Sequence, residues 1–163
     1  MFGAGDHTLR IAAYIQRVAD GGPLLVPAES YERQAGLAWV KDVGYACALA
    51  CDLRKETAGK AYNVAFDGVS LRNLIEGIAR ALGLPARFHP VPFSDLPAGA
   101  SPYGPDPRRA AGYVLDRARA ELGFEPSSLE DALAETLAWY RVAHPSHPGY
   151  ANRAEELAFA ARA

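Results

Sequence analysis

The sequence contains few cysteines and has no long apolar run. Its two cysteines, Cys47 and Cys51, stand four residues apart, a spacing that puts both on one face of a helix, where a disulfide is strained. We interpret them as small buried hydrophobic residues in a protein of the reducing cytoplasm. No apolar segment approaches the roughly 20 residues of a membrane span, and no signal-peptide core follows Met1, so we expect no membrane partner.

Positive charge is also limited. The lysines are Lys41, Lys55 and Lys60, and the formal net charge is −2. Because non-specific nucleic-acid binding needs a basic surface, we expect no nucleic-acid partner. With 163 residues, of which 50% are hydrophobic, the chain is long enough to bury the core of one domain.

The motifs of the common catalytic sites are missing as well. The sequence has no GxxGxxG or GxGxxG turn, no GxSxG elbow, no HExxH helix and no Walker motif. His144 and His147 have HxxH spacing, but prolines interleave and no neighbouring cysteine or acid completes a metal set. We interpret this segment as an exposed loop, and the sequence predicts neither a catalytic set nor a metal site.

What the sequence does contain is alternating strand and helix patterns, which favour an α/β fold. The central unit is 37–52, where a short apolar run predicts a strand over Leu37–Val40 and an apolar stripe from Val43 predicts a helix. Asp42 stands between them at the expected helix N-cap. Similar patterns predict further helices over 8–19, 71–82, 117–122 and 128–141, and further strands over 24–26, 61–66 and 86–91.

Four segments, taken in order, are more specific than any single motif. FGAGD at 2–6 resembles the "vYGPGD" turn of the NAD-dependent epimerase/dehydratases, which are extended short-chain dehydrogenases/reductases. LAWVKDVGYA at 37–46 resembles their "hVxDvaxA" segment. The segments at 59–83 and 115–140 are similar to "gxxyNvgxgxxxtxxelxxxiaxxlG" and "lDxsrAxxeLGfxPxxsleegLxxtlxWy".

This resemblance implies that the chain is the C-terminal, substrate-binding half of an extended Rossmann-type α/β protein whose nucleotide-binding half is absent. The substrate-binding portion would span 1–141, followed by a tail over 142–163 with room for one short helix. No tyrosine in the sequence is followed four residues later by lysine, so the YxxxK pair of the family is missing. We therefore expect no catalysis by these residues alone, with NAD or NADP bound mainly by the absent half.

The resemblance also assigns candidate site residues. Phe2, Gly3 and Asp6 would lie near the nicotinamide end of the cofactor. The substrate, in the family a nucleotide-linked sugar, would contact loop residues, several of them arginines that can grip a phosphate bidentately. These candidates are His7, Arg10, Arg33, Tyr103, Arg108 and Arg109. The family has an arginine shortly before "hVxD", where this chain has Ala35-Gly36 and only Arg33 nearby, which leaves a smaller or unphosphorylated substrate open.

Two alternatives compete with this interpretation. The chain could be a free-standing, non-catalytic binding or docking module derived from the same fold, or an RNA-interacting relative, although the net charge of −2 disfavours the latter. An isolated C-terminal half should expose a large apolar patch. We therefore predict self-association or pairing with a separate Rossmann half.

Overall fold

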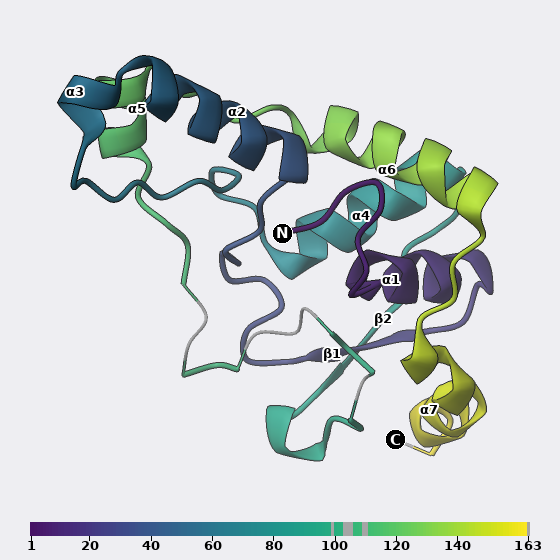
Figure 1. Ribbon diagram of the computed structural model, residues 1–163. Coiled ribbons are helices and arrows are strands. Elements are labelled where there is room, and N and C mark those ends of the chain that lie inside the picture. The colour runs from purple at the N-terminus through teal and green to yellow at the C-terminus, as the bar shows by residue number, and fades with distance from the viewer. Residues whose placement is uncertain (99, 103–105, 109–110, 163) are drawn as a thin grey trace.

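The computed structural model describes residues 1–98, 100–102, 106–108 and 111–162. Figure 1 shows helices stacked above a small sheet, with a second group of helices extending to one side. The helices are α1 (Arg10–Ala19), α2 (Val40–Asp52), α3 (Arg54–Thr57), α4 (Leu71–Leu82), α5 (Asp116–Leu122), α6 (Leu129–Ala143) and α7 (Arg153–Ala160). The strands are β1 (Leu24–Pro27) and β2 (Phe88–Val91), and two 3₁₀ turns are η1 (Phe93–Asp95) and η2 (Pro148–Asn152).

Helices α1, α4 and α6 form the main helical layer (Figure 1). Their inner faces contribute most of the largest apolar cluster, which also contains Phe2, Trp39 and Phe66. Helix α4 occupies the predicted residues because both its ends are fixed locally. Ser70 accepts a hydrogen bond from the backbone of Asn73 in a capping box, and Gly83 ends the helix in the left-handed conformation.

The sheet consists of β1 and β2, which run parallel with Leu24 opposite Phe88 and Pro27 opposite Val91. The strands predicted over 24–26 and 86–91 are confirmed. All four residues of β1 are buried, whereas β2 exposes Pro90, so the sheet has one well-covered strand and one half-covered strand.

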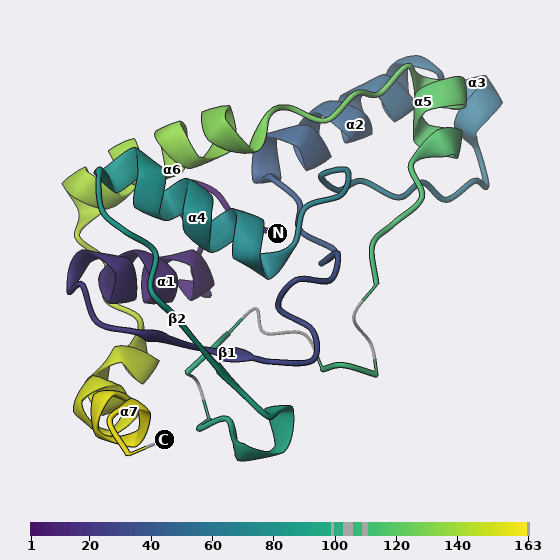
Figure 2. The ribbon, with the colours of Figure 1, turned by 180° about the vertical axis from the view of Figure 1, so that it is seen from behind.

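Helices α2, α3 and α5 form an arm beside the main layer, which is clear from the front and from behind (Figures 1 and 2). A separate small cluster, of Ala46, Ala118, Leu122 and Phe124, holds this arm together. Helix α2 buries only Asp42 and Ala46. The arm is therefore a thin layer with a large exposed surface.

Two predicted strands are wrong. In the segment Leu37–Val40 only Trp39 forms a bridge, to Phe2, and α2 already begins at Val40. The segment 61–66 is extended but forms no strand. Phe66 donates to the carbonyl of Leu37 at 2.8 Å, yet no backbone–backbone hydrogen bond joins residues 61–65 to any other described residue. A strand exists only with a partner ladder, and these residues have none.

The predictions for three side chains are also wrong. Asp42 is not the N-cap of α2, since the helix begins earlier and its N-cap is Trp39, without a side-chain cap bond. Cys47 and Cys51 are exposed and free rather than buried. They lie outside the buried side of α2, which among its residues buries Asp42 and Ala46. None of the described helices has both the length and the apolar character needed to cross a membrane.

Candidate functional site

The turn at the start of the chain is fixed by pairing with the residues that precede α2. The Phe2 amide donates to the carbonyl of Ala38 at 2.9 Å, and the Val40 amide donates to the carbonyl of Phe2 at 2.8 Å. The Phe2 ring is buried and stacks on Phe66, with their centroids 5.8 Å apart. Its side chain therefore anchors the turn, and only its backbone faces the site.

Gly3 is required at the next position of the turn. Its φ is +155°, and a Cβ built there would lie 2.3 Å from Cγ1 of Val40. Gly5 has a φ of +77° but open space around it. The first glycine allows the turn and α2 to approach closely, and the second allows the chain to reverse.

Asp6 organises the residues that lead into α1. Its Oδ1 accepts hydrogen bonds from the backbone N and the Oγ1 of Thr8, at 2.9 and 2.6 Å. Arg10 Nε donates to the same Thr8 hydroxyl at 3.2 Å. Asp6 Oδ2 is buried, and no hydrogen-bond partner for it exists among the described residues. This oxygen keeps the capacity to accept a hydrogen bond, although it is not exposed to solvent in this structure.

These residues enclose a cavity of about 330 Å³, large enough for part of a small-molecule ligand. It brings together five of the predicted site residues, Phe2, Gly3, Asp6, His7 and Arg10. Thr8 and Val40 also line it and were not predicted. The position of Thr8 could have been predicted from the sequence, because a threonine two residues after an aspartate is typical of an Asx turn.

The lining of the cavity includes both acidic and basic groups. Burial lowers the pKa of the Met1 amino group, and the charge of Arg10 lowers that pKa further, against the opposite effect of Asp6. The described residues contain no group of three or more histidine, cysteine or acidic side chains that could hold a metal ion. The arrangement can bind and orient a polar ligand, with Asp6 as acceptor and Arg10 as cation.

Arg33 and Arg108 do not line this cavity. Arg33 is exposed, and its guanidinium donates to the Pro107 carbonyl at 3.2 Å. Arg108 is 85% exposed and pairs with Asp106 at 2.8 Å, which raises the pKa of its guanidinium. The two arginines are thus brought near one another through the loop at 106–108. Tyr103 and Arg109 lie outside the residues that the structure describes.

A second hollow lies on the arm and is apolar. It has a volume of about 380 Å³. We call it the open face, and it is lined by Val43, Ala46, Cys47 and Ala50 of α2, Tyr62 and Val64 of the unpaired segment, and Leu122 of α5.

No protein-family model and no curated protein matches the sequence. Solved structures do match. The UDP-glucuronic acid 4-epimerase from Bacillus cereus, solved with UDP-glucuronic acid and NAD, aligns with a TM-score of 0.63 and 16% identity over 87% of this chain. The epimerase Mth375 from Methanothermobacter thermautotrophicus gives 0.62 and 20% over 88%, and the UDP-glucose 4-epimerase from Thermotoga maritima gives 0.54 and 21% over 83%.

The alignment covers 43%, 41% and 40%, respectively, of those three chains, so this chain spans less than half the length of the enzymes it matches. The likeness confirms the predicted α/β fold, which this chain shares with part of each of these epimerases.

Proposed function

We propose that this chain is the substrate-binding portion of an NAD(P)-dependent epimerase or dehydratase acting on a nucleotide-linked sugar. The observation that carries the proposal is the cavity around Asp6 and Arg10, within a fold shared with enzymes solved with UDP-sugars. In this assignment Arg10 donates hydrogen bonds to oxygen atoms of the sugar.

The residues proposed for the cofactor fit it in part. Gly3 lines the cavity, although Val40 fills the side on which a Cβ would lie, and Asp6 Oδ2 has no partner among the described residues that an amide group would have to displace. Phe2 is 1% exposed and already stacked on Phe66, so its side chain supports the turn only. The nicotinamide would supply the hydride chemistry, and Gly3 and Asp6 would orient one end of it.

Arg33 and Arg108 are proposed to hold the diphosphate. Both lie at the loop 106–108, and both are exposed. Arg108 is paired with Asp106 through two nitrogens, at 3.0 and 2.8 Å. Because an exposed ion pair is worth little, a diphosphate can replace the aspartate at small cost. Tyr103 and Arg109 remain candidates for the same role.

We further propose that the open face binds a nucleotide-binding half, whether on this polypeptide or on another. Three features support this. The face is apolar, the backbone of residues 61–65 has no ladder partner among the described residues, and the matched enzymes are more than twice as long as the aligned region. An extended partner segment could pair with residues 61–65. Without such a partner, we expect two copies to cover the face for each other.

A cytoplasmic location is part of this proposal. Cys47 and Cys51 are both exposed and unpaired, which suits a reducing compartment. The Cys47 thiol, which lines the open face, would also be protected when a partner covers that face.

The proposal is tested by titration calorimetry of the chain with UDP-glucose, UDP and NAD. We expect UDP-glucose to bind, and Arg10→Ala to weaken that binding about tenfold, the effect of one lost charged contact. Arg141→Ala, which removes an exposed arginine from α6, is the matched control and should bind as the unaltered chain does. Absence of heat with UDP-glucose and UDP alike would overturn the proposal.

A further inference from the structure

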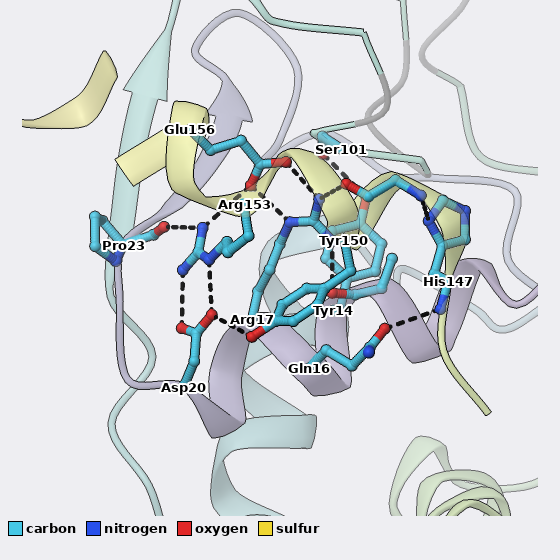
Figure 3. A network of polar contacts seen from close by, with 12 residues as sticks. Tyr14, Gln16, Arg17, Asp20, Pro23, Ser101, His147, Tyr150, Arg153 and Glu156 are labelled. Atoms are coloured by element: carbon cyan, nitrogen blue, oxygen red, sulfur yellow. Dashed lines mark hydrogen bonds and ion pairs between the residues drawn. The ribbon is translucent and has the colours of Figure 1, made fainter. Parts of the chain in front are cut away.

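The end of the chain is tied to α1 by a buried ion pair. Arg17 of α1 is 0% exposed, and Glu156 of α7 is 2% exposed. Arg17 Nε donates to Glu156 Oε2 at 2.9 Å, and the Arg17 Nη2 atom donates to Oε1 of the same carboxylate. Arg17 also donates to the carbonyls of Ala13 at 2.9 Å and Gly149 at 3.3 Å. Figure 3 shows the guanidinium enclosed by these acceptors.

A second arginine, Arg153 of α7, extends the same network. Arg153 donates two hydrogen bonds to the Asp20 carboxylate, from Nε at 2.7 Å and from Nη2 at 2.9 Å. It also donates to the carbonyl of Pro23 at 2.9 Å and to Glu156 at 3.1 Å. Gly22 makes room for it, because a Cβ there would lie 2.6 Å from an Arg153 nitrogen. Two arginines and two carboxylates thus balance one another where α1 ends and β1 begins (Figure 3).

The start of η2 is held to α1 as well. The His147 amide donates to Gln16 Oε1 at 3.0 Å, and the Tyr150 hydroxyl donates to Asp20 at 2.9 Å. Residues 147–160 therefore bind α1 at both ends, and we call this segment the latch.

The other side of the latch is apolar and packs on the loop that follows β2. Phe159 and Ala160 pack against a small cluster of Leu25, Val91 and Ala100, and Leu96 packs against the same cluster. Close by in sequence, Ser101 Oγ and the buried Tyr14 hydroxyl of α1 are 3.0 Å apart (Figure 3). The described residues of 96–101 are thus held by α7 through apolar contacts and by α1 through a hydrogen bond.

We propose that the latch sets the position of the loop that begins at Leu96, with Glu156 as the positioning residue. Glu156 fixes α7 against α1, and α7 in turn presents Phe159 to the loop. The same loop continues to Arg108, where Arg33 holds the Pro107 carbonyl. This inference concerns the chain itself and does not depend on the proposed function.

Hydrogen exchange of the full chain tests the latch through Glu156→Gln, which leaves Arg17 buried without its counter-charge. We expect exchange to become about tenfold faster in residues 145–162 and in 92–102, while α4 changes by less than about twofold. Glu155→Gln is the matched control, because Glu155 is the exposed neighbour on the same helix, and it should leave both segments unchanged.

A second variant separates the two sides of the latch. Phe159→Ala removes the apolar contact and spares the ion network, so exchange should rise in 92–102 while residues 147–156 stay protected. Two outcomes would overturn the proposal. In one, Glu156→Gln frees the latch and leaves 92–102 unchanged. In the other, α4 loses protection to the same extent as the loop. If Glu156→Gln does not fold, an unchanged loop in Phe159→Ala is sufficient to reject the proposal.

Discussion

The carboxylate of Asp42 holds Ser127 with both of its oxygens. Oδ1 accepts from the Ser127 hydroxyl at 2.7 Å, and Oδ2 accepts from the Ser127 backbone amide at 3.1 Å. Asp42 lies in the first turn of α2, and Ser127 stands immediately before Ser128, the N-cap of α6. This contact therefore joins the arm to the main helical layer.

Loss of this contact should destabilise the protein. Asp42 is 5% exposed, so Asp42→Ala leaves the serine amide and hydroxyl without their acceptor. We expect the free energy of unfolding to fall by about 1–3 kcal/mol, measured by urea denaturation. Asp52→Ala changes an exposed aspartate at the end of the same helix and should cost less than about 0.5 kcal/mol. Equal losses in the two variants would contradict the role given to Asp42.

Substitutions at the two glycines of the turn at residues 2–6 can be compared with each other. Gly3→Ala places a Cβ against Val40, which should cost about 1–3 kcal/mol through overpacking and reduce the affinity of the cavity for a UDP-sugar. In Gly5→Ala the new Cβ meets no neighbouring atom. The free energy of unfolding should therefore fall only by the backbone term of about 1–2 kcal/mol, and ligand affinity should be retained. Calorimetry together with denaturation distinguishes the two, and equal loss of ligand binding would argue against a cavity closed by Val40.

The open face predicts association of the chain. We expect sedimentation equilibrium to show a concentration-dependent dimer, which Cys47→Asp weakens by about tenfold or more because a charge enters an apolar contact. Tyr45→Asp adds the same charge to the same helix, at an exposed position that does not line the face, and should leave the dimer unchanged. A clean monomer at high concentration would contradict the prediction.

His147 predicts a pH dependence of the latch. Burial lowers its pKa below the ordinary value of 6.5, and the positive charge of Arg17 lowers it further. Below pH 6.5 the unfolded chain therefore binds more protons than the folded one, so the stability contributed by neutral His147 is complete above pH 6.5 and is lost as the pH falls toward the folded pKa. Protonation also ends the hydrogen bond from the Gly149 amide to Nδ1, now 3.0 Å long.

Hydrogen exchange at pH values of about 7.5 and 5.5, corrected for the intrinsic rate, measures this effect. Residues 145–162 should lose protection at the lower pH. His147→Gln should remove the difference, while His144→Asn, at an exposed position with a φ of +45° that asparagine tolerates, should keep it. A difference that persists in His147→Gln would assign the effect to another group.

Much of the helical framework could be predicted because its signals are local. Ser70 begins α4 and Gly83 ends it, each through contacts with residues of the same helix. The segment 61–66 could not be predicted in the same way. Its β-branched and aromatic residues match a strand, but a strand also needs a neighbour, and none of the described residues pairs with 61–65.

The candidate site shows the same division between local and distant contacts. The turn 2–6 and Arg10 could be placed together from the sequence because they are neighbours along the chain. The pair of Arg17 and Glu156 spans 139 residues, and an arginine in an amphipathic helix gives no sign that it is buried. Similarly, Asp42 was interpreted as a local cap because nothing in the sequence points from it to Ser127.

The central claim is that the cavity beside α1 binds a nucleotide-linked sugar. Hydrogen exchange of the chain with and without saturating UDP-glucose tests this claim most directly. We predict slower exchange in residues 2–10 and in 106–109, with α7 unchanged. Unchanged exchange in residues 2–10, or protection confined to other parts of the chain, would contradict it.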